Sequence, residues 1–326
     1  MEILIIGAGA VGGYFGGLLA KGRDNSAGSL DVTFLARGEH LKAIQERGLS
    51  IKSIKGDFNI RVRAVERLPD AEKFDLIIFA VKSYDLPDAC QNIKNAVGDN
   101  TIIMSLLNGV DSEDIVGSFF GMEKVIGSVA FIGAQILEPG VISHTAAGMI
   151  TIGELNNPIN PPLIPLYKRG TEGDLRGTGG RCEEILRIFE SAGVPIKLSE
   201  DINKDIWSKM VWNVGFNAIT AITGSMVSDV LAVPESRKVV EMAMKETVDV
   251  AREKGIKITD DIVEKTISKT LKAGAIKTSM LQDIENGKKT EIDSINGAIV
   301  RMGREMGIPV PVNETLYGIV KIIDKG

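Results

Sequence analysis

A glycine-rich turn close to residue 10 constrains the fold of this chain more than any other feature. Gly7, Gly9 and Gly12 form the sequence GAGAVG, which follows the apolar run 3–6 and precedes a helical pattern over 11–21. The first glycine permits a tight turn, the second lets the backbone approach a pyrophosphate, and the third allows the helix to pack closely on the strand. This order predicts a dinucleotide site, with a glycine turn that binds no ligand as the alternative. Its expected members are Gly7, Gly9, Ala10, Val11 and Gly12.

The pattern of elements changes near residue 200. Before that point, short β-rich runs alternate with helical stretches, which predicts a parallel sheet covered by helices. Beyond it the alternation stops and long amphipathic patterns follow. The fold class that we predict is an α/β Rossmann-type doubly wound sheet over residues 1–200 and an all-α domain over residues 201–326.

The individual elements follow from the same periodicities. The expected strands are 2–6, 31–35, 74–80, 101–105, 124–130 and 194–198, with short antiparallel additions at 135–136, 141–143 and 149–152. The expected helices are 83–97 and 181–192 in the first half, and 202–222, 234–254, 260–272, 292–306 and 313–323 in the second.

The composition argues against several function classes. The 326 residues carry a net charge of -5, with acidic and basic side chains intermixed, so we expect no partner among nucleic acids or membranes. Cys90 and Cys182 lie far apart, without the spacing of a zinc site, and no metal is predicted. The apolar run 3–6 is too short for a signal sequence, so a cytoplasmic protein is expected. Only His40 and His144 are histidines, which indicates that another residue type donates protons in any catalysis.

Residues that follow the later strands extend the predicted cofactor site. NAD enzymes place an acid after the second strand to bind the ribose 2′-hydroxyl, whereas a 2′-phosphate needs a cation there. This chain has Ala36 and Arg37 at that point, which favours NADPH over NADH, with a solvated arginine as the alternative. Lys82 and Asn108 also follow expected strands, at the edge where open α/β sheets bind ligands. A surface cation and a plain turn are the alternatives for these two.

A line of polar residues crosses the apolar segment 205–223. Lys209, Asn213 and Asn217 are each four residues apart, which on a helix advances about 40° per step over about 12 Å, so they share one face. Their apolar neighbours favour a polar cleft, and a narrow solvent-exposed edge is the alternative. Burial lowers the pKa of a lysine, which suits Lys209 to protonate a ketone oxygen that gains negative charge as hydride arrives.

Two later motifs have ordinary explanations. Ser279 with Gln282 fits a capping box, and Thr290 with Asp293 fits the start of the following helix. Glu291 is then explained as a first-turn acid that the helix dipole favours. Spacing alone does not require a functional role for these residues.

The motifs taken together resemble one known family. GAGAVGGYFGGLLA, LARG, AVKSYD, LLNGV, the helix with WSKMVWN and FN, and TSMLQD followed by TEIDSINGAI are similar to the ketopantoate reductase family, in order along nearly the whole chain. The resemblance implies an N-terminal Rossmann domain, a helical C-terminal domain and a site in the cleft between them. It also implies NADPH-dependent reduction of 2-dehydropantoate, a small 2-keto acid, to (R)-pantoate on the route to pantothenate and coenzyme A.

The resemblance further implies roles for the matching residues. Lys209 is the expected general acid, and Glu291 is expected to help position the substrate and the lysine. The expected substrate-binding residues are Asn108, Asn213, Asn217 and Ser279. The expected cofactor-binding residues add Arg37, Lys82 and Asn108 to the glycine turn.

The chain departs from the family pattern at two connections. An insertion lengthens the first helix-to-strand connection over 23–30, and a proline-rich loop covers 155–180. We expect the second to decorate the surface, with a cover for the cleft as the alternative. Two other functions stay open: a reductase of another small 2-keto acid on the same scaffold, and a non-catalytic NADPH-binding regulator that would not need Lys209. The oligomeric state is also open, with a homodimer as one candidate.

Overall fold

The chain folds as two compact units. The computed structural model describes residues 1–22, 30–155 and 180–325, so most of both unusual connections lies outside the described residues. The first unit comprises residues 1–107 and 113–202, and the second comprises residues 108–112 together with the chain from residue 203 onward. The first unit thus ends at Ile202, against an expected boundary at residue 200, and the loop 108–112 belongs to the second unit rather than the first.

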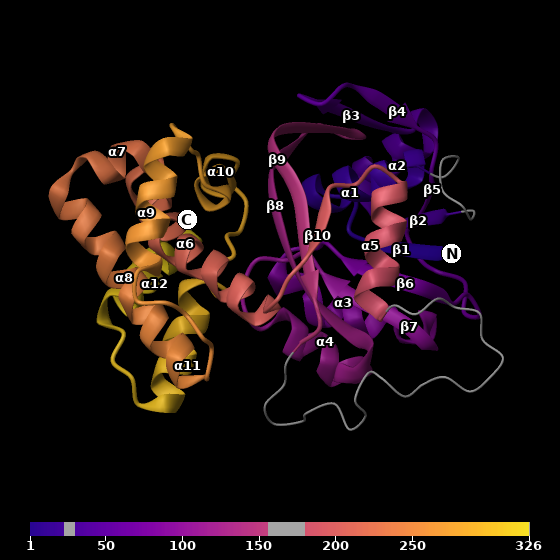
Figure 1. Cartoon of the computed structure of the whole chain (residues 1–326). Coiled ribbons are helices and arrows are strands. Elements are labelled where there is room, and N and C mark those ends of the chain that lie inside the picture. Colours follow the sequence, from indigo (N-terminus) through magenta and orange to yellow (C-terminus); the bar gives the residue numbers. More distant parts are fainter. Residues whose placement is uncertain (23–29, 156–179, 326) are drawn as a thin grey trace. The chain divides into compact units, whose positions relative to one another are not determined.

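Within the described residues, one mixed sheet organises the first unit (Figure 1). Its parallel centre has the order β2 (Asp31–Leu35), β1 (Glu2–Ile6), β6 (Phe74–Phe79), β7 (Val97–Ser105) and β8 (Val125–Glu138). Strand β8 returns as the antiparallel β9 (Val141–Gly153), which β3 (Leu49–Ser53) and β10 (Ile196–Leu198) join in parallel; β4 (Phe58–Ile60) and β5 (Arg63–Val65) form the ends. Because β1, β2 and β6 are parallel neighbours, the loops that follow them emerge at one edge.

Helices cover both faces of this sheet. Helices α1 (Ala10–Lys21), α2 (Gly38–Arg47) and α5 (Arg181–Ser191) lie on one face, and α3 (Leu86–Asn92) and α4 (Ser112–Phe120) lie on the other. Successive residues of β1 alternate between the two apolar cores: Ile3 and Ile5 pack under the first set of helices, and Leu4 and Ile6 pack under the second. The predicted doubly wound α/β unit is therefore confirmed.

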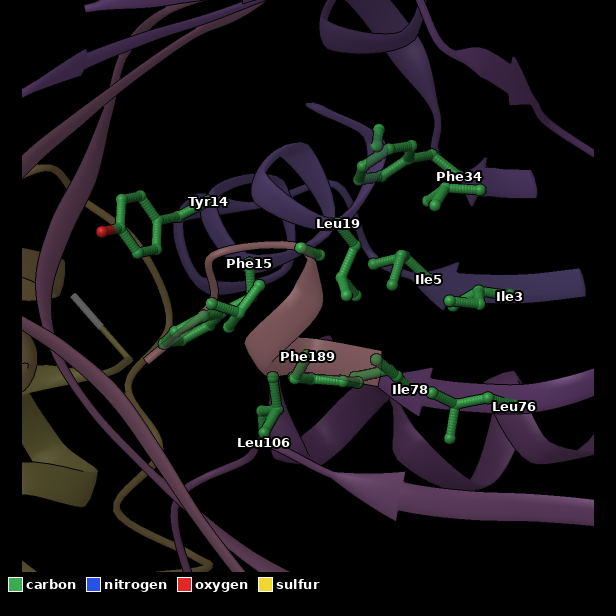
Figure 2. Close-up of a cluster of buried hydrophobic side chains, with 14 of the residues drawn as sticks. Ile3, Ile5, Tyr14, Phe15, Leu19, Phe34, Leu76, Ile78, Leu106 and Phe189 are labelled. Carbon is green, nitrogen blue, oxygen red and sulfur yellow. The ribbon is translucent and has the colours of Figure 1, made fainter. Parts of the chain in front are cut away.

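Figure 2 shows the core beneath α1 and α5. Phe15, Leu19 and Phe189 are fully buried and pack over the strand residues, whereas the hydroxyl of Tyr14 points away from this cluster. Tyr14 instead stacks on His144, with ring centroids 4.2 Å apart, and burial raises its pKa. The core therefore holds α1, and with it the glycine turn, firmly on the sheet.

The second unit is helical, as predicted (Figure 1). Its helices are α6 (Ile202–Thr223), α7 (Val227–Ala232), α8 (Pro234–Glu253), α9 (Ile262–Ala273), α10 (Ser279–Glu285), α11 (Asn296–Met306) and α12 (Pro311–Ile323). Polar contacts fix their packing: Asn296 donates to the carbonyl of Val214 on α6, at 3.3 Å. The Glu246 carboxylate on α8 accepts the amides of Val312 and Asn313 in the first turn of α12, both at 2.9 Å, which favours that helix terminus. None of the helices in the described ranges has the length and apolarity to span a bilayer.

Several elements differ from the sequence prediction. Strands β3, β4 and β5 and helices α2 and α4 were not predicted, because their three to ten residues mix polar and apolar side chains without a clear period. The short antiparallel additions prove to be one long hairpin of β8 and β9, whose turn contains Gly140 at φ +82°. Its β-bulges interrupt the alternation that would otherwise reveal a long strand.

Candidate functional site

The glycine turn is built at the carboxyl end of β1, between β2 and β6. Gly7 adopts φ +98°, and its amide donates to the carbonyl of Leu35 at 3.0 Å. A Cβ atom on Gly7 would lie 2.7 Å from the carbonyl oxygen of Ala80, and one on Gly12 would overlap the carbonyl of Gly7. These two positions therefore accept only glycine, for reasons of local packing.

Gly9 differs from its neighbours because open space surrounds it. A Cβ atom there would meet no heavy atom within 4 Å, and Gly9 has extended backbone that an alanine can adopt. Gly9 is the N-cap of α1, so the amides of Ala10, Val11 and Gly12 point out of the first turn without acceptors inside the helix. Open backbone beside a helix N-terminus fits a pyrophosphate.

Two charged loops flank the glycine turn. Arg37 follows β2 as the N-cap of α2, and Lys82 follows β6 just before the 3-10 turn η2 (Ser83–Asp85). The guanidinium of Arg37 forms an ion pair with the carboxylate of Asp85, at 3.1 Å. The sequence motif AVKSYD contains Asp85, but only the order of the strands reveals that it faces Arg37.

In the second unit, the polar line on α6 is largely buried. Lys209, Asn213 and Asn217 lie on one continuous helix, and the lysine is half-buried while both asparagines are buried. Asn217 is only 1% exposed, and neither its amide nitrogen nor its amide oxygen has a hydrogen-bond partner among the described residues. An unpaired buried amide costs about 1–3 kcal/mol, so a polar molecule that paired with it would be stabilised there.

Asn108 and Glu291 come together from distant parts of the sequence. Both belong to the second unit, and the amide of Asn108 donates to the Glu291 carboxylate at 3.4 Å, a long hydrogen bond. Gly109 follows at φ +118°, and a Cβ atom there would lie 3.1 Å from the carbonyl of Ser294. Tight backbone packing therefore keeps the loop after β7 beside the carboxylate.

The capping prediction at α10 was off by one residue. Thr278, not Ser279, is the N-cap, because its hydroxyl accepts the amide of Leu281 at 3.2 Å. The same hydroxyl lies 2.7 Å from that of Thr220, one turn beyond Asn217 on α6. Ser279 is therefore the first residue of the helix, is exposed, and is not required as a cap.

The predicted start of α11 at Thr290 and Asp293 was wrong, because both side chains bind α12 and its end instead. Thr290 donates its hydroxyl to Asp324 at 2.8 Å, and Asp293 accepts from Tyr317 at 2.7 Å and from Lys321 at 3.0 Å. Burial alone would raise the pKa of Asp293, but these two donors hold it below its ordinary value. Helix α11 begins only at Asn296, so Glu291 lies before the helix and not in its first turn.

The two histidines serve the structure of the first unit. His40 Nδ1 accepts the amide of Gly140 at 3.1 Å, and His144 is bound between the Ser53 hydroxyl at 2.8 Å and the Ala146 carbonyl at 3.1 Å. Burial lowers the pKa of both imidazoles, so they are neutral at neutral pH. Neither is in the unit that contains the polar line of α6.

Comparison with protein families decides the relationship. The model described as "Ketopantoate reductase PanE/ApbA" matches residues 3–157, and its C-terminal counterpart matches residues 201–324. The chain belongs to the ketopantoate reductase family. A 2-dehydropantoate 2-reductase of Pyrococcus abyssi is 36% identical over 98% of this chain and 97% of its own length. The chain is therefore an enzyme, an oxidoreductase of this family.

Solved structures show the same fold. The 2-dehydropantoate 2-reductase of Geobacter metallireducens superimposes with a TM-score of 0.85, at 32% identity, over 98% of this chain and 99% of that one. A D-mandelate dehydrogenase in complex with NADH has a TM-score of 0.82 at 25% identity, over 100% of this chain and 99% of that one. Solved proteins with this fold are thus named for different substrates.

The contrast between Gly9 and Gly12 yields a prediction. Gly9→Ala should leave the thermal unfolding midpoint close to that of the unsubstituted protein but weaken dinucleotide binding by about tenfold or more, because the methyl group enters the space that the pyrophosphate needs. Gly12→Ala should instead cost about 1–3 kcal/mol of stability, since its methyl group overlaps the backbone of Gly7. Thermal unfolding and dinucleotide titration measure the two effects. Equal binding by the Gly9 variant and the unsubstituted protein would exclude a pyrophosphate at this turn.

Proposed function

We propose that this enzyme reduces 2-dehydropantoate to (R)-pantoate with NADPH, a reaction of pantothenate and coenzyme A biosynthesis. The observation that carries the proposal is the buried amide of Asn217, which has no hydrogen-bond partner in the described part of the chain and lies in line with Lys209 on α6. A helix with this arrangement is suited to a small polar substrate. The named activity of the Pyrococcus abyssi and Geobacter metallireducens relatives supports the choice of substrate. A cytoplasmic location is the natural setting for such an enzyme.

The first unit would hold the cofactor. The amides of the glycine turn would bind the pyrophosphate, and the Arg37 guanidinium would donate to the 2′-phosphate. Lys82, in the loop that follows β6, would contact the nicotinamide half of the cofactor. Asn108, which belongs to the second unit, would contribute to the same contact. When bound, NADPH supplies the hydride that the ketone carbon accepts.

The second unit would hold the keto acid and supply the proton. As the ketone carbon gains hydride, its oxygen gains negative charge, which the Lys209 ammonium stabilises and then neutralises by donating a proton. The products are an alcohol, a neutral amine on Lys209 and the oxidised cofactor. Lys209 recovers its proton from water before the next turnover.

The remaining polar residues would bind and orient the substrate. Asn213, Asn217 and Ser279 offer amide and hydroxyl groups to the substrate hydroxyl and carboxylate. Glu291 would help to position the substrate and Lys209, and its hydrogen bond with Asn108 fixes the orientation of its carboxylate. This set binds a small molecule by hydrogen bonds, so an analogue without the matching hydroxyl group leaves buried amides unpaired.

One alternative within the same reaction class is another 2-keto acid. The likeness to a D-mandelate dehydrogenase favours this alternative, because that enzyme is named for a different 2-hydroxy acid. A comparison of 2-dehydropantoate with phenylglyoxylate and 2-ketoisovalerate separates the two. We expect kcat/KM for 2-dehydropantoate to exceed that for 2-ketoisovalerate, which lacks the hydroxymethyl group, by at least about 10²-fold. A higher kcat/KM for phenylglyoxylate would reassign the substrate.

The proton donor is tested by Lys209→Ala. We expect kcat to fall by about 10²–10⁴-fold with NADPH affinity almost unchanged, because the ammonium acts on the developing oxyanion rather than on the cofactor. Lys204→Ala is the matched control, since Lys204 lies on the same helix but outside the polar line. Steady-state kinetics and NADPH titration give the two readouts. An unchanged kcat for the Lys209 variant would remove the mechanism and favour a binding role.

The 2′-phosphate contact is tested by Arg37→Ala. Charge-assisted hydrogen bonds contribute about 1.5–3 kcal/mol, so the variant should weaken the binding of NADPH by about tenfold or more. The affinity for NADH should change little. Fluorescence titration with both cofactors measures the ratio of dissociation constants. Equal losses for NADPH and NADH would contradict a contact with the 2′-phosphate.

A further inference from the structure

The ion pair between Arg37 and Asp85 joins the two loops beside the glycine turn. Strand β1 lies between β2 and β6, and the arginine follows β2 while the aspartate ends the turn after β6. The pair therefore bridges the carboxyl end of β1, next to the turn at Gly7. In folds of this kind, the adenosine ribose binds at the end of the second strand.

The two side chains offer opposite chemistry to the ribose. A carboxylate accepts the hydrogen of a 2′-hydroxyl and repels a 2′-phosphate, whereas a guanidinium donates to a 2′-phosphate. Arg37 Nη2 lies 3.1 Å from Asp85 Oδ2, so a ribose that reaches one of these side chains is also close to the charge of the other. The arginine that the sequence predicts for NADPH is thus paired with an acid of the type that favours NADH.

We propose that Asp85 is a specificity-determining residue that reduces the preference of this enzyme for NADPH over NADH. Asp85 competes with the 2′-phosphate for the Arg37 guanidinium and accepts the 2′-hydroxyl of NADH. The inference rests on the proposed contact of Arg37 with the cofactor and adds an opposing residue to it. The enzyme therefore uses both cofactors, with a preference set by the balance of these two charges.

Exposure makes this competition reversible. The side chains of Arg37 and Asp85 are 81% and 36% exposed, and exposed ion pairs add little to stability. The arginine can therefore exchange the carboxylate for a phosphate without disturbing the fold. The carboxylate stays on the turn after β6, where it continues to repel a group with two negative charges.

The test compares two substitutions of Asp85 by their effects on binding. Asp85→Asn removes the charge and retains an oxygen acceptor, whereas Asp85→Ala removes both. Glu241→Gln is the matched control, because it removes one charge from an exposed ion pair with Arg237 on α8. Calorimetry would give the dissociation constants for NADPH and NADH, and for adenosine 2′,5′-bisphosphate and adenosine 5′-monophosphate, which report on the adenosine half without turnover.

We expect Asp85→Asn to lower the dissociation constants of NADPH and the bisphosphate by about tenfold, equivalent to about 1.4 kcal/mol. The dissociation constants of NADH and the monophosphate should change by less than about twofold. Asp85→Ala should tighten the binding of NADPH and the bisphosphate to the same extent. It should weaken the binding of NADH by about fivefold, since the 2′-hydroxyl loses its acceptor. The Glu241 variant should match the unsubstituted enzyme. An NADPH-to-NADH ratio that Asp85→Asn leaves unchanged, or a weakened binding of NADPH, would overturn the proposal.

The proposed contact of Arg37 with the cofactor and the proposed role of Asp85 can be disproved independently of each other. If Arg37→Ala alters the cofactor ratio but Asp85→Asn does not, the 2′-phosphate contact stands and the role of Asp85 is wrong. If Arg37→Ala leaves the ratio unchanged, the cofactor contact itself is wrong, whatever the Asp85 variants do.

Discussion

The close approach of the glycine turn to Ala80, directly after strand β6, is the constraint on which the first unit depends. Gly7 and Gly12 have no room for side chains, so α1 leaves the sheet at a fixed angle and its N-terminus stays at the carboxyl edge. The core beneath α1 makes that position rigid, because Phe15 and Leu19 are buried in one cluster with residues of the sheet and of α5. The loops after β2 and β6 are then held on either side of one turn, and Arg37 and Asp85 meet as a result.

The two units use polar groups in opposite ways. In the first unit, the charged pair is exposed, costs little to separate and can exchange partners. In the second unit, Asn213 and Asn217 are buried, and the Asn217 amide has no hydrogen-bond partner among the described residues, which is costly. The first arrangement suits a large cofactor that is recognised at several points, and the second suits a small molecule that must match each polar atom. The family relationship is consistent with this division of roles.

Periodicity predicted the elements that are apolar and regular. The glycine turn, the central strands and the whole of α6 follow from local sequence, because Ile3 to Ile6 and the neighbours of Lys209 have clear patterns. Short strands such as β4 and β5 were missed, since three residues at the end of a sheet need little hydrophobicity. The predicted start of α11 was misplaced because Asp293 binds Tyr317 and Lys321 of α12. These are tertiary contacts, which a local sequence motif cannot indicate. The contacts Arg37–Asp85 and Asn108–Glu291 depend on strand order and on distant residues, so spacing could not reveal them.

The discontinuity of the second unit affects how the chain can be divided. In the sequence, residues 113–202 of the first unit separate the loop 108–112 from the rest of the second unit. The loop nevertheless supplies Asn108, which donates to Glu291, and Asp111, which forms an ion pair with Arg301 at 2.8 Å. A fragment that began at residue 203 would omit both partners and leave a buried carboxylate without its amide donor. Gene dissection at the apparent boundary would therefore yield an incomplete helical domain, and grafting that domain onto another nucleotide-binding unit would require the loop to be transplanted with it.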